Sequence, residues 1–416
     1  MAVSSTSQRG KQAQLIRPAG PKLIQAVPWT SGGQVTIAQQ VDLSLPIRGI
    51  RLDFRGRLVT GTAAMTSVVP EGLLNLITNI VIQGTNARQK GNVTLWNIDL
   101  ATAWVSSYLF GPRGCGTMTI ALAGAGSDAQ VPPPGTPFPA GGTAVPNKSA
   151  GYFATANATY DFIITCDFPF HPWEANALGK QPGSILGFLV RNEEWKDSLQ
   201  IQLTFPTIPT ATLTTTVLGS QPAGTTNVFS AYNSGAGTPI VTLYSLPVLM
   251  GLGNKDNVLP GILSRTSQAI SSSLLTAAGT NVVLMNMQKQ PTPRVILKLG
   301  TGTVYPSFAT LDYGTGVNLT AVGIVLGGNR NVRNMISPVV HKHQQADVYD
   351  TDPIAGYVVM DFMDQGNPDS SFEGQNIGDG ASFQLIGNVV GLPNAQGLVV
   401  QEQILHTPQG PLFANG

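Results

Sequence analysis

Residues 50–58 read IRLDFRGRL, and their side chains alternate between apolar and charged along most of the stretch. Successive side chains of a β-strand point to opposite faces of the sheet. The apolar face would hold Ile50, Leu52, Phe54 and Leu58. The charged face would hold Arg51, Asp53, Arg55 and Arg57. This pattern predicts a strand with one face in a core and the other toward solvent or a neighbour.

The same alternation recurs far along the chain. It is found in residues 198–205 (SLQIQLTF), 382–389 (SFQLIGNV) and, less regularly, 294–300 (RVILKLG). Clusters of Gly, Pro, Asn and Thr separate these runs, as expected for the turns of antiparallel sheets. The sequence therefore predicts an all-β chain built as sandwiches or barrels.

One segment has the periodicity of a helix. In residues 92–111, NVTLWNIDLATAWVSSYLFG, large side chains recur at every fourth position, at Trp96, Leu100, Trp104 and Tyr108. This spacing predicts a helix capped by Asn92 or Thr94 and ended before Gly111. A stripe of aromatic residues at this spacing is typical of core packing, so we prefer that interpretation to a ligand-stacking platform.

Residues 166–174, CDFPFHPWE, bring together the side-chain types of a nucleophilic or metal site. The preceding alternation, however, puts Cys166 and Asp167 on opposite faces of a strand that Pro169 and Pro172 end, before a short helix at 173–178. A catalytic cysteine also needs an orienting group and an oxyanion donor, which nothing nearby supplies. We interpret the stretch as a strand end with a buried cysteine.

Other chemical signals are weak. His341 and His343 stand two apart with Asp347 nearby, and this fragment is more typical of a solvated loop than of a metal site. Phosphate-loop, dinucleotide-binding, zinc-protease and hydrolase motifs are missing. Two cysteines, Cys115 and Cys166, do not make a disulfide framework and are compatible with a reducing compartment. We predict no catalytic, cofactor-binding or metal residues, no cofactor and no enzymatic activity.

Charge is scarce and unevenly distributed. Only 11% of the 416 residues are Asp, Glu, Lys or Arg, against about 25% in ordinary soluble domains. Residues 198–254 contain none, and residues 112–157 are rich in Gly, Pro and Ala, which predicts a long surface insertion. A surface with so few charges is poorly protected against association, so we expect much of it to be covered by copies of the chain.

The first 41 residues contain no acidic side chain. Their cations are Arg9, Lys11, Arg17 and Lys22. Such an arm could contact a lipid surface, nucleic acid or a neighbouring subunit, or could be a frayed terminus. The first residues lack the apolar segment of a secretory signal, and no apolar run reaches the length of a membrane span.

Several stretches, taken in order, carry a family resemblance. Residues 73–104 (LLNLITNIVIQGTNARQKGNVTLWNIDLATAW) resemble the strand, Gly turn and Trp-bearing helix of the double jelly-roll major capsid proteins of tailless icosahedral viruses, the tectivirus and adenovirus lineage. Residues 159–184 with 195–205, 238–252 and 352–390 are similar to later strands of that family, from the first jelly roll to the second. The added segment at 187–197 and the insertion at 112–157 depart from the tectiviral pattern and affect loops.

The resemblance implies two consecutive eight-stranded jelly rolls with a few short helices and long loop insertions. It divides the chain into an N-terminal basic arm (1–33), a first jelly roll (34–252, with the insertion at about 112–157), and a second jelly roll with a C-terminal tail (253–416). It implies a structural protein of the virion capsid shell, made in the host cytoplasm, with a bacterial virus as the expected source. The arm cations Arg9, Lys11, Arg17 and Lys22 would face the inner side of the shell.

The implied partners are copies of the chain itself, as a homotrimer with a roughly hexagonal footprint and then as neighbouring capsomers, together with vertex and minor capsid proteins and an internal membrane. Specific nucleic-acid readout is not expected. Three alternatives stay open at this point. They are a secreted or surface β-sandwich binding module or adhesin, a β-sandwich hydrolase, and the capsid fold of tailed phages, although the last calls for a long charged helix that the sequence lacks.

Overall fold

The structure is a computed structural model that describes residues 16–59, 61, 67–68, 73–86, 91–110, 116–122, 157, 159–170, 190, 195, 199–207, 219–220, 228–250, 262–271, 279–285, 294–301, 318–326, 330–336, 357–361, 383–390 and 395–406. Within these ranges the chain is almost entirely β-sheet, with one α-helix, α2 (Leu100–Phe110), and a 3-10 turn, η1 (Leu74–Leu76).

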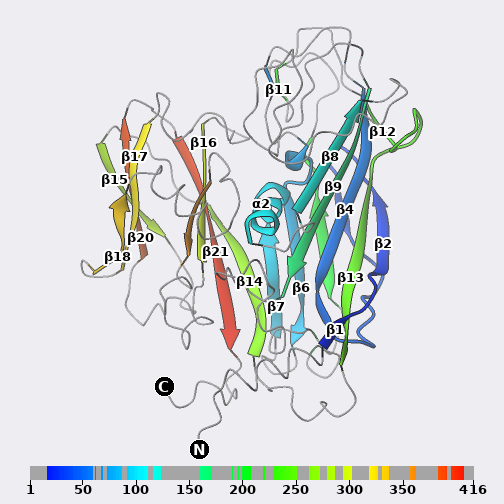
Figure 1. Ribbon diagram of the computed structural model, residues 1–416, viewed down its shortest axis with the longest axis horizontal. Helices are drawn as coiled ribbons and strands as arrows, with labels where there is room; N and C mark the ends of the chain where they lie inside the picture. Colours follow the sequence, from blue (N-terminus) through cyan, green and yellow to red (C-terminus); the bar gives the residue numbers. More distant parts are fainter. Residues whose placement is uncertain are drawn as a thin grey trace, which may run out of the picture.

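Three large sheets organise the described chain (Figure 1). The first has the order β1-β13-β4-β9-β8. In addition, β2 pairs with β13 and β12 pairs with β4. The strands of this sheet are β1 (Ile16–Pro18), β2 (Lys22–Pro28), β4 (Ile47–Val59), β8 (Gly116–Leu122), β9 (Thr159–Pro169), β12 (Val228–Ser230) and β13 (Ile240–Met250). The second has the order β19-β16-β21-β14-β7-β6-β10-β3. Its strands are β3 (Gln34–Thr36), β6 (Asn79–Asn86), β7 (Gly91–Ile98), β10 (Gln200–Thr204), β14 (Ile262–Ser271), β16 (Arg294–Thr301), β19 (Tyr357–Asp361) and β21 (Ala395–His406).

The third sheet has the order β15-β20-β17-β18, formed by β15 (Gly279–Met285), β17 (Asn318–Leu326), β18 (Arg330–Ile336) and β20 (Phe383–Val390). The short strands β5 (Ser67–Val68) and β11 (Gly219–Ser220) form a separate pair.

The same strand order occurs twice along the chain. Eight strands, β2, β3, β4, β6, β7, β9, β10 and β13, form the first set, and β14 to β21 form the second. In each set the first, eighth, third and sixth strands lie side by side, as do the second, seventh, fourth and fifth. This is the arrangement of a jelly roll, so the prediction of two consecutive eight-stranded jelly rolls is confirmed. The chain passes between the sets somewhere from Met250 to Ile262, while the exact domain limits stay predictions.

The two sheets of the first jelly roll meet through aromatic side chains. Trp96 of β7 donates its indole N–H to the carbonyl of Pro169 at 3.1 Å, and its ring stands edge-on to Phe168, with centroids 5.4 Å apart. Phe54 and Phe162, on adjacent strands β4 and β9, make a second edge-on pair at 5.2 Å. These contacts fill the space between the sheets with large, fully buried rings.

The helix is shorter than its periodicity predicts. Residues 91–98 pair with β6, so the backbone of Trp96 belongs to a strand and the expected caps Asn92 and Thr94 lie within it. The helix starts only after Asp99, whose carboxylate accepts the backbone N–H of Thr102 at 3.3 Å. The interpretation of Trp96 and Trp104 as core residues holds, since both are 1% exposed.

Strands occur within two segments that the sequence analysis assigns to an insertion and to an arm. Residues 116–122, placed in the predicted insertion, form β8 and pair with β9. Residues 16–28, placed in the predicted arm, include β1 and β2, which pair with β13. In β2 the buried residues are Ile24 and Val27, and the pairing with β13 is shifted between Leu243 and Tyr244. This bulge breaks the period of two by which the sequence could have revealed the strand.

Gly116 is the point where β8 passes beneath α2. A Cβ atom there would lie 2.6 Å from the backbone nitrogen of Tyr108 and 3.0 Å from the carbonyl oxygen of Trp104. Because both are backbone atoms of a buried helix, neither can move aside without displacing the helix.

We expect Gly116→Ala to lower the free energy of unfolding by about 1–3 kcal/mol, the usual range for an overpacked core. The matched control is Gly20→Ala, since a Cβ at Gly20 meets nothing within 4 Å; its effect should stay within about 0.5 kcal/mol. Denaturant unfolding of the two variants measures the difference. Equal stabilities would contradict the close approach of β8 to α2.

Candidate functional site

The outward face of the first sheet carries a ladder of ion pairs. Its centre is the antiparallel pairing of β4 with β9, in which Arg51 lies opposite Asp167 and Arg57 opposite Asp161. Arg51 donates to both carboxylate oxygens of Asp167, at 2.6 and 2.9 Å. Arg57 donates to both oxygens of Asp161, at 2.8 and 2.7 Å. Two bidentate pairs thus join the same two strands at the two ends of their contact.

A third pair lies between them on β4. Arg55 donates through Nε to Asp53 at 2.8 Å, and Nη2 contacts the same carboxylate oxygen. Hydrogen bonding to Asp53 raises the pKa of Arg55, and hydrogen bonding to Asp161 raises that of Arg57. Opposite charges therefore compensate one another along the face, which leaves it polar and close to neutral.

The pairs differ in how far they are removed from water. The side chain of Asp167 is 1% exposed while that of Arg51 is 30% exposed. Arg57 and Asp161 are 15% and 12% exposed, whereas Arg55 is 49% exposed. A carboxylate as buried as Asp167 is tolerated only with its guanidinium partner in place.

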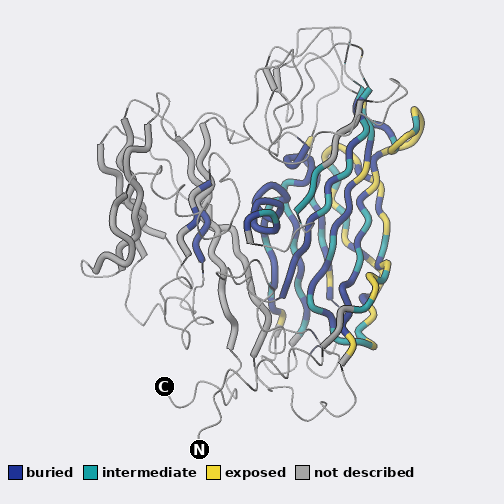
Figure 2. The backbone as a smooth tube through the Cα atoms, in the orientation of Figure 1, coloured by how far each residue is buried: buried dark blue, intermediate teal, exposed yellow. Residues whose placement is uncertain are grey.

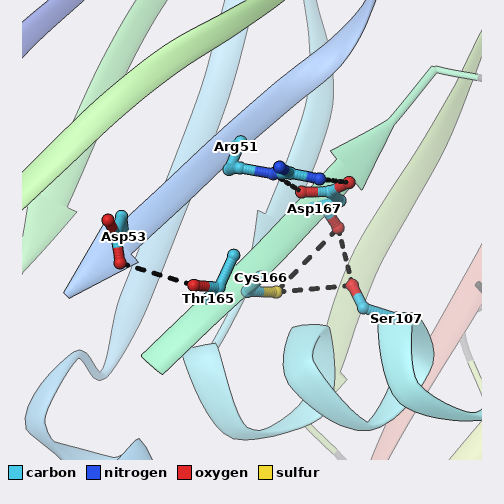
Figure 3. Close-up of polar contacts among 6 residues, drawn as sticks. All are labelled: Arg51, Asp53, Ser107, Thr165, Cys166 and Asp167. Carbon is cyan, nitrogen blue, oxygen red and sulfur yellow. Dashed lines mark hydrogen bonds and ion pairs between the residues drawn. The ribbon is translucent and has the colours of Figure 1, made fainter. Parts of the chain in front are cut away.

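The opposite face of β9 places Cys166 in the core (Figure 3). Its sulfur lies 3.4 Å from Oγ of Ser107 on α2, and Ser107 Oγ donates to the carbonyl of Asp167 at 2.7 Å. Cys166 is 0% exposed. The predicted separation of Cys166 and Asp167 onto opposite faces is confirmed. The contacts of Ser107 with these two residues hold α2 against β9. His171 and Glu174 lie outside the described residues, as do the predicted helix at 173–178 and the fragment from His341 to Asp347.

The arm cations separate into described and undescribed residues. Arg9 and Lys11 lie outside the described residues, and Arg17 lies on β1, where only the backbone is described. Lys22 lies on β2 and donates to Asp42 Oδ2 at 2.9 Å, with the side chains 42% and 53% exposed.

The backbone N–H of Ser44 and then Lys22 lower the pKa of Asp42 to about 2. This group contributes its stability above its unfolded-state pKa near 3.9 and loses it as the pH falls through about 2; the exposure keeps that contribution small.

Exposed apolar side chains gather beside the ladder. Within the part of the chain whose side chains are described, the exposed large hydrophobic residues are Leu23, Val228, Tyr232, Ile240 and Leu249. They lie on β2, on β12 and its connection to β13, and at the two ends of β13, where Figure 2 shows most of the exposed positions. Nothing in the sequence pattern distinguished them from core residues. Apolar side chains exposed beside a compensated polar face are compatible with contact with another protein.

No group of three or more metal-ligating side chains occurs among the described residues. No described helix is long and apolar enough to cross a membrane.

Comparisons with known proteins give the class of fold. No protein-family model matches the chain, and no curated protein does. Among solved structures, the chain is similar to the STIV MCP, with a TM-score of 0.55 and 14% identity over 96% of this chain and 99% of that one. It is also similar to a chain in the atomic structure of Sulfolobus Turreted Icosahedral Virus, with a TM-score of 0.53 and 13% identity over 94% and 91% of the two chains.

A third similar structure is PBCV-1 VP54 fitted into a reconstruction of the virophage Sputnik, with a TM-score of 0.52 and 12% identity over 95% of both chains. At these identities the likeness establishes the fold. The chain has the double jelly-roll fold, the fold of the family that the sequence resembles.

We expect Arg51→Ala to lower the free energy of unfolding by about 2–4 kcal/mol, because it leaves the buried carboxylate of Asp167 without its partner. The control is Lys22→Ala, which removes an exposed ion pair and should cost no more than about 0.5 kcal/mol. Denaturant unfolding at one fixed protein concentration compares the two. Similar losses would show that burial does not distinguish these pairs.

Proposed function

We propose that this protein is a structural major capsid protein that trimerises into pseudo-hexameric capsomers and tiles the icosahedral shell of a virus. The single observation that carries the proposal is the double jelly roll itself, formed twice with the same strand order and matched over nearly the whole of the STIV MCP chain. A further similar structure is that of the PBCV-1 virus capsid. In this role the chain is a structural subunit of the shell, and the role requires no catalysed reaction.

The described surface supports the same proposal. A jelly roll pairs most of its backbone within two packed sheets, which gives a rigid wall with few open edges. The compensated ladder of Arg51, Arg55 and Arg57 leaves no strong field on the outer face. Such a face can lie against a neighbouring subunit without burying unpaired charge.

An extracellular binding module built on the same sheets is the second candidate. Its recognition would depend on the Thr, Gly and Ala loops, and it predicts a monomer or an elongated fibre. A hydrolase would need two carboxylates facing one another across a cleft. The described carboxylates of Asp53, Asp161 and Asp167 each pair with an arginine, which suits a structural face better than an acid–base pair.

The wider partners belong to the same proposal. Beyond copies of the chain, they are vertex and minor capsid proteins and an internal membrane, with the virion as the location and a bacterial virus as the source. The arm cations Arg9, Lys11, Arg17 and Lys22 face the inner side of the shell. Because Lys22 is already paired with Asp42, the cations ahead of β1 are the ones that would contact a membrane or an adjacent capsomer.

We expect the purified protein to have a mass in solution of about 131 kDa, three times the 43.6 kDa of one chain. Light scattering behind a sizing column measures it. A trimer supports the capsomer. A monomer that stays monomeric at high concentration would contradict the proposal and favour the binding module.

We expect a double substitution, Arg9→Gln with Lys11→Gln, to leave the trimer intact and to reduce its binding to anionic lipid vesicles by at least tenfold, since each cation near such a surface is worth about 1 kcal/mol. The control is Lys22→Gln, whose cation is engaged by Asp42. Vesicle flotation of the purified trimers compares them. Unchanged flotation of the double variant would contradict a contact between the arm and the membrane.

A further inference from the structure

β4 carries four arginines, and the one at its start differs from the other three. Arg51, Arg55 and Arg57 each turn the edge formed by Nε and Nη2 toward a carboxylate. Arg48 has no carboxylate partner among the described residues, and its buried Nε has no hydrogen-bond acceptor. A buried donor of a charged group is costly without an acceptor. Arg48 is therefore the arginine of β4 that a bound anion would stabilise.

The backbone holds Arg48 in place through neighbours on two sides. Its carbonyl accepts the backbone N–H of Phe170 at 2.8 Å. The preceding residue, Ile47, exchanges two backbone hydrogen bonds with Val190, each 3.0 Å long. Arg48 itself is only partly buried, so a ligand can approach its side chain from solvent. A cation on so fixed a backbone is preorganised for a ligand, because little backbone freedom remains to be lost on binding.

A second arginine lies at the same end of the first sheet. Ile47 pairs with Pro247 of β13, and Arg17 of β1 pairs with Leu249, two residues further along β13. From the spacing of neighbouring strands and the rise per residue, the backbones of Arg17 and Arg48 are roughly 15 Å apart. We call β1, the start of β4 and the adjoining end of β13 the β1 end; it is the lower end of this sheet in Figure 1, opposite β12.

Acidic side chains do not compensate these two arginines within the described part of the sheet. The described carboxylates at the β1 end are those of Asp42 and Asp167, which Lys22 and Arg51 already engage. The β1 end therefore has an excess of two positive charges, one from each of the two arginines. The guanidinium group is well suited to phosphate, because its planar fork of donors matches the spacing of phosphate oxygens.

We propose that the β1 end binds a phosphate group, with Arg48 as the main ligand and Arg17 as the second cation. The group is inorganic phosphate or the phosphate of a lipid headgroup, which present the same kind of oxygens to a guanidinium. Two arginines suit a single phosphate better than a nucleic-acid strand, which calls for a stripe of cations. Where the phosphate belongs to a lipid, the inference rests on the proposed function, in which an internal membrane is a partner.

Titration of the purified protein with inorganic phosphate at fixed ionic strength, followed by calorimetry, tests the site. We expect Arg48→Gln to weaken binding at least about tenfold, because it removes a charge-assisted hydrogen bond. The matched control is Arg55→Gln, which changes the charge equally on the same strand, at an arginine that Asp53 engages. This control should bind phosphate as the wild type does. Equal binding by the wild type and Arg48→Gln would overturn the proposal.

Flotation with vesicles that contain phosphatidylglycerol distinguishes the two sources of phosphate. Flotation that Arg48→Gln reduces and Arg55→Gln does not would identify a lipid headgroup, whereas calorimetric binding without flotation would identify free phosphate. A preparation with the mass of a trimer that binds neither probe would refute this inference and leave the capsomer intact. A monomer that binds phosphate through Arg48 would refute the capsomer alone.

Stability without phosphate tests whether Arg48 has a partner inside the protein. Arg48→Met keeps a long apolar side chain and removes the charge. In phosphate-free buffer we expect its unfolding midpoint in denaturant to equal or exceed that of the wild type, since no internal ion pair is broken. Arg51→Met is the matched comparison and should lower the midpoint, because it leaves the buried carboxylate of Asp167 unpaired. Equal losses in the two variants would reveal an internal partner of Arg48 and contradict the proposal.

Discussion

β4 and β9 pair along residues 49–59 and 159–169, and two bidentate ion pairs hold their register. A slip of β9 by one residue would move Phe162 from the core to the outer face and would separate Arg51 from Asp167. The rest of the first jelly roll is positioned from this contact. The backbone carbonyl of Asp167 accepts a hydrogen bond from the hydroxyl of Ser107 on α2. The backbone carbonyl of Pro169 accepts a hydrogen bond from the indole N–H of Trp96 in the second sheet. The charged outer face and the packed inner face are therefore consequences of a single register.

Much of this register could be predicted from the sequence, but not all. The alternation in residues 50–58 identifies both faces of β4, and the same reading separates Cys166 from Asp167. The arginines at 51 and 57 are six residues apart, as are the aspartates at 161 and 167. Equal spacing of opposite charges on two strands indicates that the strands pair with these charges opposite one another, although the spacing alone fits either orientation.

Other features depend on contacts that no local pattern carries. The residues before Asp99 have a helical spacing, yet pairing with β6 makes them a strand, because tertiary hydrogen bonds outweigh a weak periodic preference. The bulge in the pairing of β2 with β13 interrupts the alternation that would have predicted β2 as a strand. The residue type of Leu23 does not show that this leucine is exposed and not part of the core. Exposure of an apolar residue is decided by what packs over it, so the border of the candidate surface emerged only from the fold.

The scarcity of charge takes on a structural meaning once the pairs are known. In the described part of the first jelly roll, Lys22, Arg51, Arg55 and Arg57 each have a carboxylate partner, whereas Arg48 of β4 has none among the described residues. Such a surface exerts little long-range attraction or repulsion on a neighbour, so charge alone cannot select the correct face. Where such a surface meets another protein, shape and apolar area must therefore select the contact, and charge contributes little to it.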